Sequence, residues 1–178
     1  QRIIFSKNSW SLYDSDKSKV LTVKDCLPIN SVTELSFAYF NNSFSRLFPD
    51  LDIDKSRRIF TLLEDLLSYT NGANILISKA AKQESARLTK QGMAVTPFLL
   101  TEKWLRNISS IDGTVIIDAN GYCHAFGVIL DGLSNSLGLA SRGGRYNSAV
   151  MYCGTAKHSC MIIVLSQDGS VDIIASKN

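Results

Sequence analysis

VIIDANGYCHAFGVIL, residues 115–130, consists of two apolar runs that flank the turn dipeptide Asn120-Gly121. Asn-Gly between apolar runs is a strong local signal for a β-hairpin. A similar pattern returns at Met161 to Leu165 and Val171 to Ala175, which flank Ser166-Gln167-Asp168-Gly169. The C-terminal part of the chain is therefore predicted to contain antiparallel strands.

Helical patterns precede and separate these strands. Between Arg57 and Tyr69 apolar residues recur at helical spacing, and Ala73 to Ser78 is a short apolar run with the length of a buried strand. Further helices are predicted over Lys82 to Lys90, Thr101 to Ile108 and Arg145 to Cys153. Helices that alternate with hairpins predict an α/β (α+β) fold, with a mixed, mostly antiparallel central sheet flanked by helices.

These predicted elements place the main domain at residues 56–178. The first fifty or so residues mix short apolar patches with polar loop residues, and we expect residues 1–55 to form an appended segment packed on the main domain. Because the chain begins with Gln1 and not with Met, we expect it to be part of a longer protein with additional domains.

Composition excludes several classes of function. A net charge of +3 is far from the basic face of a protein that binds duplex nucleic acid. No apolar run approaches the roughly 20 residues that cross a bilayer, so we expect a soluble, cytoplasmic protein without a membrane segment. The four cysteines include no Cys-x-x-Cys pair, which favours reduced thiols. The alternative is a zinc site drawn from Cys123, His124, Cys153, His158 and Cys160.

Residues 141–149 read SRGGRYNSA, in which small flexible residues precede Arg145 and the predicted start of a helix. Glycine lets the backbone approach a phosphate closely, a helix N-terminus adds partial positive charge, and an arginine supplies a bidentate fork. The pattern indicates a phosphate site. The alternative is a tight connection before a helix.

A carboxylate stands at the start of a predicted strand, in Asp112-Gly113-Thr114. An aspartate at such a position is placed to hold a divalent cation or to prepare a hydroxyl group for attack. The alternative is an aspartate that caps a turn, because Asp-Gly is common in turns.

Together, the two motifs resemble those of the diadenylate cyclase domain, over about Arg57 to Ala175. Asp112-Gly113-Thr114 is similar to the family's Asp-Gly-Ala motif, and Gly143 to Asn147 is similar to its Gly-Thr-Arg-His-Arg motif. The run Gly72 to Ile77 resembles the family's Gly-Ala-Leu-Ile-Val strand, and its Ser-Glu-Glu stretch falls near Leu165 to Gly169.

The resemblance implies a domain that binds ATP or a cyclic dinucleotide. In the family two domains meet face to face, and each 3′-hydroxyl attacks the α-phosphate of the opposite ATP, so a homo-oligomer is implied. Asp112 and Arg145 would be catalytic, and Asp112 would bind Mg²⁺ or Mn²⁺ if the chain is active, with no cofactor otherwise. The implied nucleotide-binding residues are Ile75, Gly113, Thr114, Gly143, Gly144, Arg145, Tyr146, Asn147, Ser148 and Gln167.

The motifs also depart from the family pattern. Gly144 replaces a threonine, Tyr146 a histidine and Asn147 a second arginine, which removes a cation from a site built for triphosphates. Losing a phosphate contact in a transition state lowers the rate by orders of magnitude, whereas ground-state binding often survives. We therefore expect a nucleotide sensor that signals to an attached domain. The alternatives are an active cyclase that makes cyclic di-AMP and a structural domain without a ligand.

Overall fold

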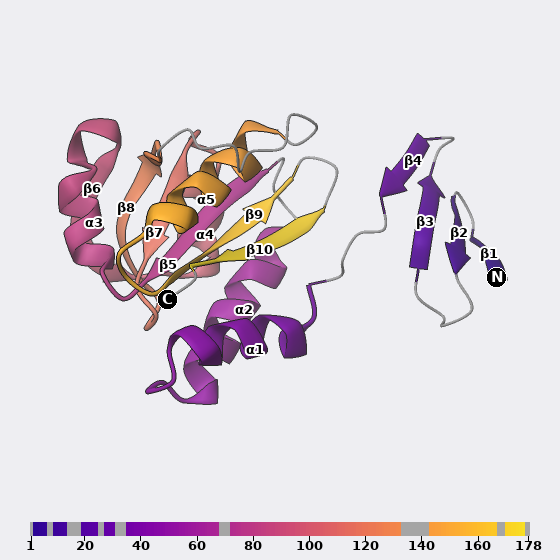
Figure 1. Ribbon diagram of the computed structural model, residues 1–178, viewed down its shortest axis with the longest axis horizontal. Helices are drawn as coiled ribbons and strands as arrows, with labels where there is room; N and C mark the ends of the chain where they lie inside the picture. Colours follow the sequence, from indigo (N-terminus) through magenta and orange to yellow (C-terminus); the bar gives the residue numbers. More distant parts are fainter. Residues whose placement is uncertain are drawn as a thin grey trace.

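The computed structural model describes residues 2–6, 9–13, 19–24, 27–30, 35–67, 72–132, 143–166 and 170–176. Its main part is a six-stranded sheet with the strand order β10-β9-β5-β7-β8-β6 (Figure 1). These strands are β5 (Ala73–Ser78), β6 (Met93–Leu99), β7 (Thr114–Ile117), β8 (Tyr122–Val128), β9 (Cys160–Leu165) and β10 (Val171–Ala175). β5 and β7 run parallel, and the other neighbouring pairs are antiparallel. The prediction of a mixed, mostly antiparallel sheet is confirmed.

Helices cover both faces of this sheet. They are α1 (Phe37–Leu47), α2 (Ile53–Leu67), α3 (Ala81–Arg87), α4 (Glu102–Ser109) and α5 (Gly144–Thr155), with a short 3₁₀ turn, η1 (Thr89–Gln91). α1, α2 and α4 pack on one face, and α3 and α5 pack on the other. In the part of the chain that the structure describes, no helix combines the length and the apolar character that crossing a bilayer requires.

The neighbouring strands β5 and β9 are buried on both faces. In β5, Ile75 and Ile77 belong to the core shared with α1, α2 and α4, whereas Leu76 belongs to the core shared with α3 and α5. Successive side chains of a strand point to opposite faces, so a strand covered on both sides becomes a continuous apolar run. β9, with the sequence CMIIVL, follows the same rule, and every residue of both strands is buried.

Local signals fix where two of the helices begin. The hydroxyl of Ser36 accepts a hydrogen bond from the backbone N–H of Tyr39 at the start of α1, at 3.2 Å. Thr101 does the same for Trp104 at the start of α4, at 3.4 Å. Such N-cap contacts satisfy a backbone donor that has no partner within the helix.

Four strands before α1 form a second, antiparallel sheet (Figure 1). Its strands, in spatial order, are β1 (Arg2–Ser6), β2 (Ser9–Tyr13), β3 (Lys19–Lys24) and β4 (Leu27–Asn30). α1, which follows in the sequence, packs into the core of the six-stranded sheet through Phe40, Phe44 and Leu47. That core thus includes a helix which the predicted division at residue 55 assigns to the appended segment.

The described cysteines do not gather at one point. Cys123 belongs to the core on one face of the sheet, whereas Cys153 and Cys160 belong to the core on the other. These thiols cannot share one ion, as the zinc alternative requires. Within the described ranges, no three side chains of His, Cys, Asp or Glu are grouped so as to hold a metal.

Candidate functional site

Asp112 and Arg145 meet at one edge of the six-stranded sheet. The parallel pairing of β5 with β7 places the beginnings of these two strands side by side. Asp112 lies two residues before β7, and Arg145 is the second residue of α5. Nη2 of Arg145 lies 3.5 Å from Oδ1 of Asp112. The structure therefore brings together the Asp112-Gly113-Thr114 motif and the glycine-arginine motif at Gly143 to Asn147.

Gly72, immediately before β5, leaves room for the guanidinium of Arg145. A Cβ built on Gly72 would lie 2.9 Å from Nη1 of Arg145 and 3.2 Å from the carbonyl oxygen of Leu165. Its φ of 118° is also one that residues with a side chain rarely adopt. Both the space and the backbone conformation at this position thus depend on glycine. The sequence places Gly72 within a strand motif but carries no signal for this contact.

Asn74 ties β5 to the first turn of α5. Its Nδ2 donates a hydrogen bond to the carbonyl oxygen of Arg145 at 3.1 Å, and the hydroxyl of Ser148 donates to the same oxygen at 3.0 Å. The Asn74 side chain is buried, and its Oδ1 has no hydrogen-bond partner among the residues that the structure describes. A polar residue inside the apolar run Ala73–Ser78 was the sequence signal for this role, and we did not predict it.

The Asp112 side chain is 96% exposed. Its Oδ1 accepts a hydrogen bond from the backbone N–H of Gly113 at 3.0 Å, so the carboxylate also caps its own turn. Gly113 has a φ of 116°, and a Cβ there would lie 2.5 Å from the carbonyl carbon of Gly127, which makes glycine a steric requirement. An exposed ion pair such as Asp112–Arg145 contributes little to stability. Breaking it so that either side chain can contact a ligand therefore costs little free energy.

The glycine turn beside Arg145 is open. Gly143 and Gly144 are exposed, and a Cβ built on either glycine would meet nothing within 4 Å. Tyr146, Asn147 and Ser148 follow in the first turns of α5, where each is partly exposed. The structure thus places these five residues next to Arg145 with space around the turn.

Two other predicted site residues are placed differently. The side chains of Thr114 and Ile75 are 2% and 1% exposed, and Ile75 lies in the hydrophobic core. Neither side chain reaches the surface near Asp112. Gln167 lies outside the described residues.

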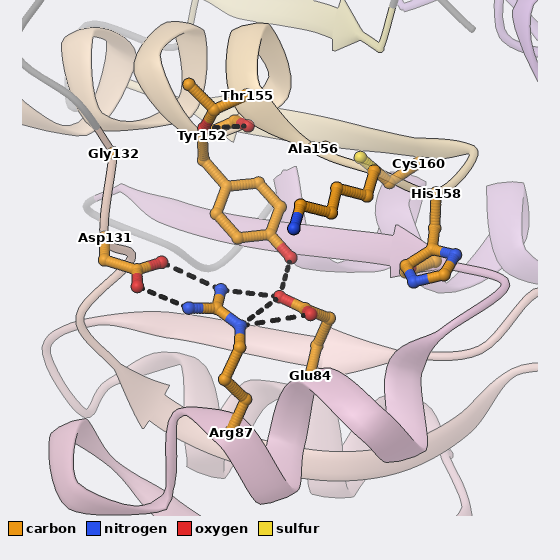
Figure 2. Close-up of a pocket in the computed structure, with 11 residues that line it drawn as sticks. Glu84, Arg87, Asp131, Gly132, Tyr152, Thr155, Ala156, His158 and Cys160 are labelled. Carbon is orange, nitrogen blue, oxygen red and sulfur yellow. Dashed lines mark hydrogen bonds and ion pairs between the residues drawn. The ribbon is translucent and has the colours of Figure 1, made fainter.

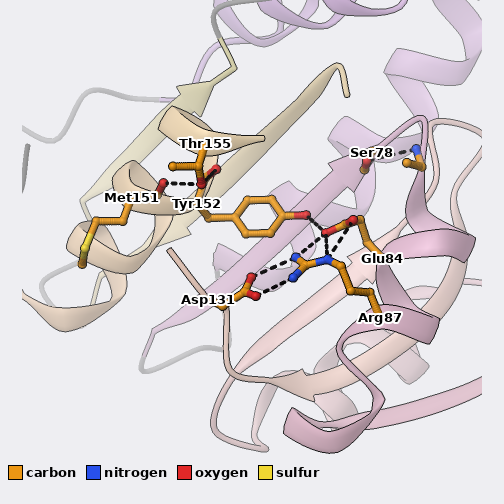
Figure 3. A network of polar contacts seen from close by, with 8 residues as sticks. Ser78, Glu84, Arg87, Asp131, Met151, Tyr152 and Thr155 are labelled. Atoms are coloured by element: carbon orange, nitrogen blue, oxygen red, sulfur yellow. Dashed lines mark hydrogen bonds and ion pairs between the residues drawn. The ribbon is translucent and has the colours of Figure 1, made fainter. Parts of the chain in front are cut away.

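A separate pocket of about 400 Å³ lies beside the other end of α5 (Figure 2). Tyr152 donates a hydrogen bond to Oε2 of Glu84 at 2.6 Å. Nη2 of Arg87 donates to the same oxygen at 2.7 Å and to Oδ1 of Asp131 at 2.8 Å (Figure 3). This network joins α5, α3 and the segment after β8. Its contacts between different elements span 44 and 68 positions of sequence, so no local pattern predicted them.

The network makes stability depend on pH. Hydrogen bonds from Arg87 lower the pKa of Asp131 below its ordinary value of 3.8. Burial acts to raise the pKa of Glu84, but hydrogen bonds from Arg87 and Tyr152 outweigh burial and leave that pKa below 4.5. A carboxyl group whose pKa is lowered by folding stabilises the native state above its unfolded pKa, and this contribution is lost as the pH falls through the folded pKa.

We therefore expect Asp131→Asn to flatten the acid limb of the stability profile. The wild-type free energy of unfolding should fall between about pH 5 and pH 3, and the variant should lose less over the same interval because it has one such carboxylate fewer. Urea denaturation at a series of pH values measures both slopes. Equal slopes in the two proteins would show that Asp131 is not held as an anion by Arg87.

Comparisons with known proteins identify the family of the chain. The family model of the DAC domain, described as the nucleotide-binding domain of the DisA bacterial checkpoint controller, matches residues 62–178. The chain therefore belongs to the DAC domain family, and the resemblance noted in the sequence is confirmed. No curated protein sequence gives a significant match.

Two solved structures extend the comparison. A double mutant of DacA from Staphylococcus aureus is 15% identical, with a TM-score of 0.53 over 70% of this chain and 90% of that chain. A hypothetical membrane-spanning protein from Bacillus cereus is 19% identical, with a TM-score of 0.49 over 67% of this chain and 62% of that chain. At such identity the likeness to DacA shows the fold alone.

Proposed function

We propose that this domain binds an adenine nucleotide, ATP or a cyclic dinucleotide, at the edge where Asp112 and Arg145 meet, and that it acts as a sensor for an attached domain. The observation that carries the proposal is the 3.5 Å contact between these two side chains, beside the open turn Gly143-Gly144. A guanidinium, a helix N-terminus and an accessible backbone turn are three groups that bind phosphate, and here they converge.

The same edge suits a cation that arrives with the nucleotide. Mg²⁺ is usually held by one or two carboxylates together with waters and substrate phosphates, not by a cage of protein ligands. Asp112 offers one highly exposed carboxylate. Asp112 would hold such a metal, which would neutralise phosphate charge when bound.

Binding without turnover is favoured by the residues that follow Arg145. Tyr146 and Asn147 occupy the two positions where the family motif carries a histidine and an arginine. A neutral side chain at these positions retains hydrogen bonds to a bound nucleotide but supplies no positive charge to a phosphoryl-transfer transition state. We therefore expect the domain to bind the nucleotide and to turn it over slowly or not at all.

An active cyclase is the second candidate. Asp112 and Arg145 are both present, and the 96% exposure of the Asp112 side chain leaves it accessible to a nucleotide carried by a second copy of the domain. In this mechanism Asp112 would help to activate a 3′-hydroxyl and Arg145 would hold the attacked phosphate.

One pair of measurements separates the candidates. Thermal denaturation with ATP or cyclic di-AMP, with and without Mg²⁺, tests binding, and assays for pyrophosphate and for a cyclic product with Mg²⁺ or Mn²⁺ test catalysis. A thermal shift without product supports the sensor, and product formation supports the cyclase. If none of these nucleotides raises the Tm, the remaining interpretation is a structural domain without a ligand.

Asp112→Asn tests the role of the carboxylate. The variant should lose any turnover and should bind the Mg²⁺–nucleotide complex about tenfold more weakly, or about 1.4 kcal/mol. Binding measured without metal should change little, because Arg145 and the glycine turn remain. Isothermal titration with and without Mg²⁺ measures the difference, and Asp54→Asn, at an exposed position of α2, is the matched control. Equal metal dependence in Asp112→Asn and the wild type would contradict the assignment.

A further inference from the structure

The helix that carries Arg145 begins without a cap of its own. Its N-cap is Gly143, which has no side chain to accept a hydrogen bond, and the first turn contains no acidic residue. By contrast, the hydroxyl groups of Ser36 and Thr101 cap α1 and α4. Helix ends fray, and a glycine N-cap offers no side-chain acceptor against this. The position of Arg145 therefore depends on contacts from outside α5.

Asn74 of β5 supplies such a contact. Successive side chains of a strand alternate, so Asn74 lies on the same face of the sheet as Leu76, which packs in the core shared with α5. The Nδ2 of Asn74 donates a hydrogen bond to the carbonyl oxygen of Arg145 at 3.1 Å. Gly72, two residues earlier, leaves room for the guanidinium of Arg145. This part of the chain thus holds the backbone of Arg145 and accommodates its side chain.

The same amide carries an acceptor without a donor. Asn74 is 3% exposed, and within the described ranges its Oδ1 has no hydrogen-bond partner. Its neighbours on the adjacent strands are Val164, which has no polar side chain, and Thr114. Turning the amide over would bring Oδ1 against the carbonyl oxygen of Arg145, which is also an acceptor. A buried polar group without a partner destabilises the folded state.

Asparagine is therefore not the residue that stability alone favours at this position. The carbonyl oxygen of Arg145 also accepts a hydrogen bond from the hydroxyl of Ser148 at 3.0 Å, so it keeps a side-chain donor if the Asn74 amide is removed. Leucine has the same branched arrangement of heavy atoms as asparagine and would suit a strand that is buried along its whole length. Residues that break a local rule in this way are expected at functional sites.

We infer that Asn74 is a positioning residue of the nucleotide site. It fixes the first turn of α5 to the sheet, and so presents Arg145 and the glycine turn to a phosphate in one orientation. The inference rests on the proposed function, because it concerns the same site. Asn74 itself is too deeply buried to touch the nucleotide and acts through Arg145. Groups that are already held in place bind more tightly, because less conformational freedom is lost on binding.

Asn74→Leu is the principal test. The variant should bind nucleotide about tenfold more weakly, because the first turn of α5 loses its tie to β5. The urea midpoint of the ligand-free variant should stay at or above that of the wild type, because an unpaired buried acceptor is removed. Asn74→Ala, which avoids the larger volume of leucine, should weaken binding to the same extent. Isothermal titration with ATP or cyclic di-AMP measures the affinity.

Ser78→Ala is the matched control. Ser78 is also a buried polar residue of β5, but it lies at the opposite end of the strand from Asn74. Its hydroxyl accepts a hydrogen bond from the backbone N–H of Ala80 at 3.1 Å. Loss of this bond should lower the urea midpoint and leave the nucleotide affinity unchanged. The two substitutions thus separate an effect on positioning from an effect on stability.

Amide hydrogen exchange tests the inference without a nucleotide. In the first turn of α5, the N–H of Asn147 donates to the carbonyl oxygen of Gly143 at 3.2 Å. In Asn74→Leu this amide should exchange faster than in the wild type. Amides further along α5, such as that of Tyr152, should exchange at the wild-type rate.

Three results would overturn the inference. The first is wild-type nucleotide affinity in both Asn74→Leu and Asn74→Ala, and the second is unchanged exchange at Asn147. The third is a urea midpoint that falls as far in Asn74→Leu as in Ser78→Ala, which would show that Asn74 serves stability. If the wild type binds no nucleotide, the proposed function fails, and the exchange measurement alone decides whether Asn74 holds the turn.

Discussion

Arg145→Ala is expected to remove most of the stabilisation that a bound nucleotide gives this domain, with the fold intact. A ligand at one hundred times its Kd adds about 2.7 kcal/mol, which in a chain of this size raises Tm by roughly 5–10 °C. Loss of a charged hydrogen-bonding partner costs about 1.5–3 kcal/mol, or roughly 10–100-fold in affinity. At hundredfold weaker binding, the same ligand concentration adds only about 0.4 kcal/mol.

Thermal denaturation with and without nucleotide measures the loss of ligand-induced stabilisation. Two further variants serve as controls. Arg145→Lys keeps the charge but not the planar fork, so its shift should be intermediate. Lys103→Ala, at an exposed position of α4, should keep the full shift. A wild-type shift in Arg145→Ala would mean that the nucleotide binds elsewhere, and the pocket beside Tyr152 is the first place to examine.

Phe40→Ala should destabilise the domain by about 3–5 kcal/mol. The Phe40 ring is fully buried, and its centroid lies 5.7 Å from the rings of both Phe44 and Phe60. Truncation would leave a cavity between α1 and α2 and remove both aromatic contacts. Since small domains are stable by only about 5–15 kcal/mol, this is a large fraction of the total. Urea denaturation at constant pH measures it.

Tyr39→Ala is the matched control, because Tyr39 is the preceding residue of α1 and is 47% exposed. Its cost should stay within about 0.5 kcal/mol, as for most surface substitutions. If Phe40→Ala costs no more than Tyr39→Ala, α1 does not belong to the cooperative unit, and a division near residue 55 would be the better description.

The sequence was sufficient for elements with a strong local signal. The turn Asn120-Gly121 lies between β7 and β8, and there the Oδ1 of Asp118 accepts hydrogen bonds from the backbone N–H groups of Asn120 and Tyr122. α2 and α5 also lie where helical spacing and the glycine turn predicted helices, with ends shifted by a few residues. In each case the residues that determine the element lie within it.

Elements whose stability comes from distant partners were missed. β6 contains Pro97, which argues against a strand, but β6 lies at the edge of the sheet, where a missing N–H is tolerated. α1 contains Asn41-Asn42-Ser43, three residues with weak helix propensity. In the structure Oδ1 of Asn41 accepts a hydrogen bond at 2.6 Å from Ser56 of α2, so packing between helices outweighs weak helix propensity.

The residues of the candidate site also differ in whether a local motif or a distant contact defines their role. Asp112 and Arg145 stood out because each lies in a short motif with a chemical reason. The roles of Gly72 and Asn74 depend on how β5 lies beneath α5, 71 positions later in the sequence. Spacing along the chain carries no information about that contact.

The parallel pairing of β5 with β7 also bears on the order of folding. Asn74 pairs with Thr114, about forty positions later, whereas β7–β8 and β9–β10 are hairpins that close over short turns. Long loops cost more entropy to close, so the hairpins should form early and the β5–β7 ladder late. The edge that carries Asp112 and Arg145 is therefore assembled near the end of folding. A nucleotide would then slow unfolding of the completed domain and would not speed its formation.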